Sequence, residues 1–458
     1  MAEPKLVSIN PATGKVLAEY PEMDGAAVGA ALAETQGAFQ EWRQTGFAHR
    51  SGLMRKAAAI LRGEKDGFAA LMADEMGKPV RDGRAEAEKC AAGCEYYADN
   101  AEKFLAPERV ATEARSSFIA FNPLGIVLAV MPWNFPFWQV FRFAAPALMA
   151  GNAGVLKHAS NVQGCAAAIE GVFLRAGFPR SLFRNLPVTG SRISAILEDG
   201  RIRAVTLTGS VEAGRSVAAK AGALLKKSVM ELGGSDPYLI LADADVDLAA
   251  RTCAKSRLIN AGQSCIAAKR FLPVDSVRAA FEKAFVQAMA AVKSGDPRAE
   301  ETVMGPLARL DLREQLQRQV DASVAKGARL LLGGKIPEGA GAFYPPTVLT
   351  DVKPGMPAFD EEMFGPVAAV IPVRDESEAL RVANGGNFGL GAAVFTRDQA
   401  RGERIAAMEL EAGNCFVNGL VRSDPRLPFG GVKDSGYGRE LSHFGIREFV
   451  NIKTVYSE

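Results

Sequence analysis

The stretch from 203 to 232, RAVTLTGSVEAGRSVAAKAGALLKKSVMEL, contains two apolar runs separated by a segment of helical composition. Residues 203–209 end in a glycine, which is typical of a strand followed by a turn. Ser210 is a residue type that caps helices, and we expect the helix to continue to Leu225. Residues 226–232 form the second apolar run. A strand, a helix and a strand in this order predict a parallel βαβ unit.

The same alternation extends from this unit toward both ends of the chain. The first hundred residues are predicted to be helical, including one long helix over 51–79 that stops at Gly77 and Pro79. A helix over 161–179 should stop at Gly177. Strands are predicted at 115–121, 126–131, 153–157, 238–242, 269–274, 329–334, 366–373, 392–396 and 413–418. The fold class predicted from this pattern is α/β, with two doubly wound α/β domains. The β-prone tail, 447–458, should pair with the edge of a neighbouring sheet.

Composition narrows the kinds of partner. The chain has 458 residues, which predicts two or three domains. Lys and Arg number 54 against 52 Asp and Glu, so the net charge of +2 gives no reason to expect a nucleic acid or a membrane. The N-terminus lacks an apolar run of signal-peptide length, so a cytoplasmic location is expected. The three histidines are not spaced as metal ligands and there is no C-x-x-C, so no metal is expected.

Nucleotide motifs of the common kinds do not occur. Neither a P-loop nor G-x-G-x-x-G is present. The junction TLTGSVEAG, residues 206–214, places Gly209 and Ser210 at the start of a helix, where free N–H groups and the helix dipole suit a pyrophosphate. Gly214 would allow close packing. Taken alone, this junction is more often an ordinary connection between a strand and a helix.

Three polar side chains at turns are candidates for chemistry. Cys265 follows Gly-Gln-Ser, and a reactive thiol must be weighed against the commoner buried, inert cysteine. Glu231 ends an apolar strand before two glycines, and is either a general base or a solvated loop glutamate. Asn134, in VMPWNFPFW (130–138), could donate to an oxyanion, or it could belong to an aromatic core turn. A thiol, a carboxylate base and an amide donor together suit acyl-enzyme chemistry.

The sequence resembles the aldehyde dehydrogenase superfamily over nearly its whole length. The motifs PWNFP, GNAGVLKHAS, TGSVEAG, ELGGSDP, GQSC, EEMFGP and PFGGVKDSGYGRE occur in the family's order. KHAS, ELGGSDP, AAKRF and GRELSHFGI are most similar to the branch of short bacterial succinate-semialdehyde dehydrogenases. The resemblance implies NAD(P)-dependent oxidation of an aldehyde to a carboxylate through a cysteine thiohemiacetal and thioester, with succinate semialdehyde as the expected substrate.

The resemblance also implies roles for individual residues. Cys265 is the expected nucleophile, Asn134 the oxyanion donor and Glu231 the base that activates water. The expected cofactor-binding residues are Trp133, Lys157, Ser160, Gly209, Ser210, Leu232, Glu362 and Phe364. NAD-preferring relatives carry a glutamate where Ser160 stands. A serine does not repel a 2′-phosphate and Lys157 attracts one, so NADP is favoured over NAD.

Substrate residues follow from the same comparison. Arg142, one helical step after Trp138, is the expected clamp for a substrate carboxylate, with a snorkelling surface arginine as its alternative. Ser423 matches a loop that contacts substrate in this branch. Ile259 stands where longer relatives have an arginine, so a second clamp is in doubt. Glu440 matches a carboxylate that relays protons, and its alternative is an exposed helical glutamate.

The family pattern also implies three parts. A Rossmann-like cofactor domain would take 1–106 and 126–231, a catalytic domain 232–435, and a small β oligomerisation arm 107–125 and 436–458, giving a homodimer or homotetramer. The small-molecule aldehyde would be the other partner. Other functions remain open at this point. One is a dehydrogenase of the same superfamily that acts on another small aliphatic or carboxylated aldehyde, is CoA-acylating, or uses a phosphate substrate. The others are a catalytically silent binding or structural member and a thiol hydrolase or esterase without cofactor.

Overall fold

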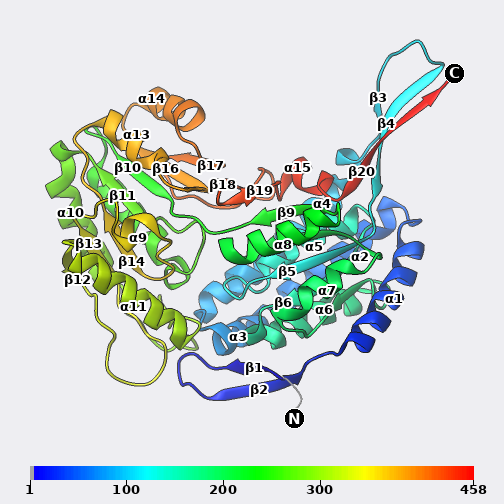
Figure 1. The fold of residues 1–458 in the computed structure, drawn as a ribbon, viewed down its shortest axis with the longest axis horizontal. Coiled ribbons are helices and arrows are strands. Elements are labelled where there is room, and N and C mark those ends of the chain that lie inside the picture. The colour runs from blue at the N-terminus through cyan, green and yellow to red at the C-terminus, as the bar shows by residue number, and fades with distance from the viewer. Residues whose placement is uncertain (1–4) are drawn as a thin grey trace.

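The computed structural model describes residues 5–458, and its core is two large sheets joined side by side (Figure 1). The first sheet has six strands. Their order across the sheet is β19 (Gly436–Tyr437), β9 (Lys227–Glu231), β8 (Ile202–Thr208), β5 (Ile126–Met131), β6 (Ala153–His158) and β7 (Phe183–Asn185). All neighbouring pairs are parallel except β19 with β9. The stretch 203–232 therefore forms the predicted βαβ unit.

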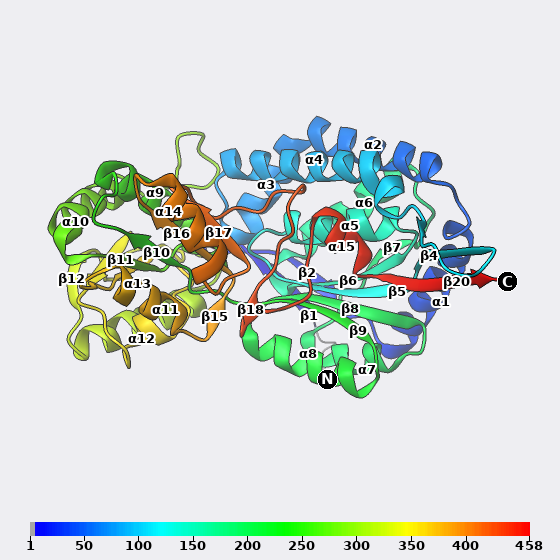
Figure 2. The ribbon, with the colours of Figure 1, turned by 90° about the horizontal axis from the view of Figure 1, so that it is seen from above.

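Helices cover both faces of the six-stranded sheet (Figure 2). They are α1 (Gly25–Trp42), α2 (Phe47–Gly63), α3 (Lys65–Met76), α4 (Val80–Phe104), α5 (Trp138–Met149), α6 (Gln163–Ala176), α7 (Ile193–Glu198) and α8 (Val211–Ala223). Ser210 caps α8 by accepting from the backbone N–H of Ala213, and Gly177 ends α6 in the left-handed region, both as predicted.

Two sequence expectations near the N-terminus are wrong. Residues 5–21 are not helical: β1 (Lys5–Ile9) and β2 (Val16–Pro21) form an antiparallel hairpin. These two strands are short, and their sequence pattern is weaker than the helical pattern of the residues that follow, so the sequence predicts helix here. The helix predicted over 51–79 is broken at Glu64, whose backbone (φ −114°, ψ 15°) lies outside the helical region. The two resulting helices, α2 and α3, can then pack separately against α4.

The second sheet has seven strands. Their order is β12 (Arg329–Leu332), β13 (Thr347–Thr350), β14 (Val367–Val370), β11 (Arg270–Pro273), β10 (Pro237–Ile240), β16 (Gly391–Phe395) and β17 (Asn414–Val417). Only the pair of β12 with β13 is antiparallel. Its main helices are α9 (Val246–Leu258), α10 (Asp275–Ala290), α11 (Leu310–Ala325), α13 (Glu376–Asn384) and α14 (Gln399–Arg404), with a short α12 (Pro357–Asp360). Each large sheet carries its own buried apolar cluster, which confirms the two doubly wound units.

The chain crosses from the first sheet to the second between Glu231 and Pro237, and returns through β18 (Val432–Lys433) and β19. β18 pairs with β15 (Phe388–Gly389). After α15 (Ser442–Arg447), the tail forms β20 (Val450–Ser457), which pairs over its whole length with β4 (Ser116–Pro123). With β3 (Glu108–Arg109) these strands make a three-stranded sheet that projects from the body (Figure 1). The tail therefore pairs with a sheet edge, as predicted.

Candidate active site

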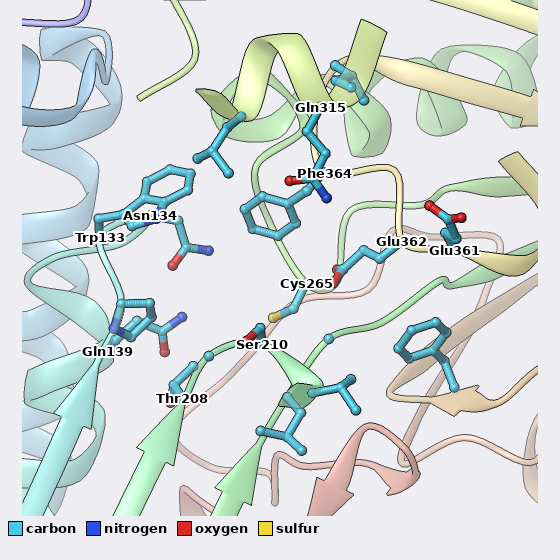
Figure 3. A pocket seen from close by; sticks show the side chains of 18 of the residues that line it. Trp133, Asn134, Gln139, Thr208, Ser210, Cys265, Gln315, Glu361, Glu362 and Phe364 are labelled. Atoms are coloured by element: carbon cyan, nitrogen blue, oxygen red, sulfur yellow. The ribbon is translucent and has the colours of Figure 1, made fainter. Parts of the chain in front are cut away.

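A cavity of about 380 Å³ lies where the two large sheets meet. Loops at the ends of β5, β8 and β9 line it from the first sheet, and the Cys265 loop, α11 and the loop before β14 line it from the second. Figure 3 shows the Cys265 sulfur at its centre, with Asn134 on one side, Glu362 on the other and Phe364 above. Predicted residues that line this cavity are Trp133, Asn134, Gly209, Ser210, Leu232, Cys265, Glu362 and Phe364.

The Cys265 loop is held by unusual backbone geometry. Asn260 and Ala261 both have positive φ, 52° and 54°, which non-glycine residues rarely adopt. Gly262 follows with φ 74°, and a Cβ there would collide with the carbonyl of Gly365. The Asn260 side chain donates to the Asn134 carbonyl oxygen at 2.7 Å, so it ties this loop to the opposite wall. The loop is therefore built around the position of its cysteine.

Lys269 fixes the loop from beneath. Its ammonium is fully buried and donates to the carbonyl oxygens of Ser264 and Cys265, at 2.8 Å each. It also lies 3.1 Å from Glu362 Oε1. Burial raises the pKa of the Cys265 thiol to about 12, and the charges of Lys269 and Arg142 oppose that rise. The thiol of the resting protein is therefore protonated at neutral pH.

Asn134 is positioned to donate into the cavity. The residue is buried, and its side-chain nitrogen donates one hydrogen to the carbonyl oxygen of Gln263 at 3.0 Å. An amide nitrogen carries two hydrogens, so a second donor remains. Figure 3 shows the amide directed toward the space beside the sulfur. The alternative of a purely structural aromatic turn does not fit, because Asn134 lines the cavity rather than the core.

Glu231 ends β9 as predicted, but its carboxylate does not line the cavity. It is buried, and its Oε1 packs against Gly430. A Cβ added to Gly430 would lie only 2.7 Å from this oxygen. Neither oxygen has a hydrogen-bond partner. Burial, then the charge of Glu440, raises the pKa of Glu231 well above its usual range. The alternative interpretation as a solvated loop glutamate is therefore wrong, because this carboxyl group is buried and its burial opposes ionisation.

Arg142 and Glu440 form a buried ion pair behind the cavity. The guanidinium contacts the Glu440 carboxylate, lies 4.7 Å from the ring centroid of Phe429, and has one nitrogen 3.3 Å from Thr208 Oγ1. Burial raises the pKa of Glu440 and Arg142 opposes this. The alternatives for both residues are wrong, because Arg142 does not snorkel and Glu440 is neither exposed nor helical. Their substrate and relay roles remain predictions.

Glu362 and Phe364 reach the cavity from the loop before β14. Glu362 Oε1 accepts from the Gly234 N–H at 3.1 Å as well as facing Lys269. The ring of Phe364 meets the ring of Trp133 edge to face, with centroids 5.8 Å apart, so two aromatic rings from opposite sheets approach each other. The N–H of Leu232 is donated to the Ser435 carbonyl, so a ligand amide would be received by the Leu232 carbonyl oxygen.

The start of α8 forms another part of the wall. The N–H of Gly209 is already donated to the Glu231 carbonyl at 3.0 Å. The capping Ser210 and the first turn of α8 face the cavity. Gly214 packs as expected, because a Cβ there would collide with the Leu232 side chain. An anion at this helix start would meet the positive end of the helix dipole.

A second cavity, of about 600 Å³, contains Lys157 and Ser160. Lys157 is the second-last residue of β6 and is buried, and burial lowers the pKa of its ammonium group. No carboxylate within residues 5–458 forms an ion pair with it, and it makes no hydrogen bond there. A buried cation without a partner is costly, so this cavity suits an anion.

Trp138 and Ser423 meet on a third side, together with a residue that the sequence did not indicate. Lys89, on α4, donates to Ser423 Oγ at 2.6 Å, and its ammonium lies 4.3 Å from the ring centroid of Trp138. Gln139, the neighbour of Trp138, lines the Cys265 cavity. Sequence reasoning missed Lys89, Gln139 and Lys269. Only Lys269 had a usable signal, a charged residue four positions after the cysteine at the start of an apolar strand.

Comparison with known proteins agrees with this geometry. The model of the aldehyde dehydrogenase family matches residues 2–455, and the chain belongs to that family. It is 48% identical to the NAD(P)+ succinate semialdehyde dehydrogenase Sad of Escherichia coli, over 99% of this chain and 98% of that protein. It is 49% identical to an NADP(+) succinate-semialdehyde dehydrogenase of Mycolicibacterium paratuberculosis, over 98% and 96%.

The fold comparison is equally close. The structure of succinic semialdehyde dehydrogenase from Streptococcus pyogenes in complex with NADP+ superposes with a TM-score of 0.96, at 36% identity, covering 98% of this chain and 99% of that one. Among residues 5–458, no helix combines the length and apolar character needed to cross a bilayer. The family match and the fold match therefore cover the same chain that forms the cavity around Cys265.

Proposed function

We propose that this protein oxidises succinate semialdehyde to succinate with NADP+, and accepts NAD+ less well. The observation that carries the proposal is the joint presence of Cys265, the Asn134 amide and Glu362 in one cavity, next to a second cavity with an unpaired Lys157. The relatives from Escherichia coli and Mycolicibacterium paratuberculosis, which are succinate-semialdehyde dehydrogenases, support the same substrate.

In the acylation half of the proposed reaction, the Cys265 thiol passes its proton to solvent water and the sulfur then attacks the aldehyde carbon. The carbonyl oxygen becomes an oxyanion, and the second Asn134 N–H stabilises it. As this oxyanion collapses, hydride leaves the carbon and a thioester to Cys265 remains. When bound, the nicotinamide supplies the acceptor for that hydride.

In the second half, water hydrolyses the thioester. Glu231 takes a proton from the water, oxygen bonds to the acyl carbon, and the Cys265 thiolate leaves. Because Glu231 does not line the cavity, this role requires its side chain to rotate toward the cavity, where contact with water would favour the ionised form that burial opposes. Glu440 and Arg142 stand behind it as a route for the released proton.

The residues fit a nicotinamide dinucleotide phosphate. Lys157 and Ser160 would hold the ribose phosphate, the start of α8 the pyrophosphate, and Glu362 the second ribose. The unpaired, buried Lys157 favours an extra phosphate, because a charged hydrogen bond in a desolvated site is stronger than a neutral one. Ser160 accepts either ribose, since it carries no repelling charge.

The three-stranded sheet is the proposed oligomer contact. β20 is its outer strand, and Ile452 and Tyr456 are 60% and 51% exposed on it. A long strand with one open edge and exposed apolar side chains is a surface that usually pairs. We infer a homodimer or homotetramer built through β20.

The experiment that tests the proposed function is a matched substrate panel. Succinate semialdehyde and butanal are assayed at 340 nm with NADP+ and with NAD+, using the wild type and Cys265→Ala. We expect kcat/KM to be highest for succinate semialdehyde with NADP+, and Cys265→Ala to reduce it by about 10⁴-fold or more. Cys415→Ala, a half-buried cysteine elsewhere, is the control. Turnover near wild type by Cys265→Ala would refute the proposal.

A further inference from the structure

Lys89 is a charged residue without a charged partner. It lies in the middle of α4, which otherwise buries that face against α5. Its ammonium is in contact with the Ser423 hydroxyl and the Trp138 ring, both uncharged. Among the ion pairs of residues 5–458, none includes Lys89. A desolvated ammonium that touches only a hydroxyl and an aromatic face lacks its natural counterion.

The charged groups around Lys89 are already occupied. Glu86, one turn earlier on α4, is bound to Lys78 and accepts from two backbone N–H groups at the start of α5, each at 2.9 Å. Asp424 is held by both arms of Arg426, at 2.8 and 2.6 Å. Neither carboxylate is within ion-pair distance of Lys89, so an additional anion would complete the cluster.

Arg142 adds positive charge on the α5 side. Its own carboxylate, Glu440, balances it. Burial, then the charge of Arg142, lowers the pKa of Lys89 to about 8, while Glu86 and Asp424 act weakly in the other direction. Cys90, next along α4, is fully buried, and burial keeps its thiol neutral. The cluster therefore has one more cation than carboxylates near neutral pH.

The cluster is connected to the wall of the Cys265 cavity through the start of α5. Trp138 begins α5 four residues after Asn134, and Gln139 beside it lines the Cys265 cavity. The charge of Arg142 acts on both the Cys265 thiol and the Lys89 ammonium. Figure 2 shows the loop between β17 and β18, which carries Ser423, reaching toward α4 above α5. Lys89, Trp138 and Ser423 do not line the cavity themselves, so an aldehyde bound at Cys265 would have to extend its far end past Gln139 to reach them.

We propose that Lys89, held in place by Ser423 and Trp138, binds the carboxylate of the aldehyde substrate and so selects short carboxylated aldehydes. This inference rests on the proposed function. It assigns to Lys89 the second positive charge that is absent at Ile259, where longer relatives have an arginine. The Ser423 hydroxyl would turn its hydrogen to the carboxylate while it still accepts from Lys89. In this arrangement Lys89 contacts the substrate carboxylate directly, and Arg142, which is paired with Glu440, attracts that carboxylate only from a distance.

The test compares Lys89→Met with Lys103→Met, the same substitution on the exposed end of α4. Both are assayed with succinate semialdehyde, butanal and the uncharged isostere 4-oxobutanamide. We expect Lys89→Met to lower kcat/KM for succinate semialdehyde by about 10- to 100-fold, mainly through KM, because a hydrogen bond to a charged group is lost. The losses for the two uncharged aldehydes should be several-fold smaller, and Lys103→Met should resemble the wild type.

A pH profile supplies an independent readout. Lys89 is charged below its lowered pKa and neutral above it, so attraction for the carboxylate is present below pH 8 and lost above it. The ratio of kcat/KM for succinate semialdehyde to that for butanal should fall as pH rises through about 8 in the wild type. In Lys89→Met the ratio should be flat. If Lys89→Met does not fold, as judged by its melting temperature, Ser423→Ala is expected to lower the same ratio.

The outcomes separate the two proposals. Equal losses on charged and uncharged aldehydes, or a wild-type ratio that is flat with pH, would overturn the role of Lys89 while leaving the oxidation intact. A wild-type protein that does not oxidise succinate semialdehyde, but oxidises butanal with Cys265 in place, would overturn the proposed substrate instead.

Discussion

The two cavities differ in how their charges are balanced. Around Cys265, Glu362 faces Lys269 and Arg142 faces Glu440, and burial raises the pKa of both the thiol and Glu231. In the second cavity, Lys157 stands alone. The charged side chains around Cys265 are paired with each other, whereas the charge of Lys157 has no partner in its cavity. The cavity around Lys157 holds a buried cation without a partner, whereas around Cys265 burial opposes ionisation of the groups that the proposed reaction uses.

The largest expected effect on turnover comes from Glu231→Gln, which tests the chemistry of the Cys265 cavity. Removing the base should slow turnover by about 10²–10⁴-fold while leaving formation of the thioester, because only the hydrolysis step loses its base. Rapid-mixing measurements should show a burst of NADPH followed by a slow steady state. Glu448→Gln, a nearby half-buried carboxylate, is the control. Loss of the burst together with the turnover would place Glu231 in the first half of the reaction.

An intermediate effect is expected for Lys157→Met. Loss of a charged contact to phosphate should raise the KM for NADP+ by about 10- to 100-fold and that for NAD+ much less. The comparison between the two cofactors isolates the 2′-phosphate, because both share every other group. Lys220→Met, a lysine on α8 paired with Glu198, serves as control. Equal losses for both cofactors would mean that Lys157 does not discriminate between them.

The smallest effect is expected for Ser210→Ala. The hydroxyl caps α8, so its loss should lower the free energy of unfolding by about 1 kcal/mol, as seen in urea titrations. Asp375→Ala removes an equivalent cap from α13 on the other sheet and should cost a similar amount. Only Ser210→Ala should also raise the KM for NADP+. If the KM rises equally in both variants, Ser210 is only a cap.

Local sequence was sufficient for much of the fold. The segments at 126–131, 203–209 and 226–232 became parallel strands, and the apolar run 126–131 is buried at every position, as expected of a strand covered on both faces. Local sequence did not predict β13, because the four residues TVLT are too few to give a clear strand pattern. It also did not predict the hairpin of β1 and β2. Hairpin pairing at the N-terminus depends on packing against residues far along the chain, which a local pattern does not contain.

The sequence by itself determined which residues could react: one cysteine after Gly-Gln-Ser, a glutamate at a strand end and an asparagine at a turn. Tertiary structure alone decided their state. Burial raised the pKa of Glu231 and of the thiol, and packing gave Arg142 the carboxylate of Glu440. It also placed Lys89 against Ser423, 334 positions away. Charge state and partner depend on desolvation and distance in space, and neither quantity is written in the order of residues.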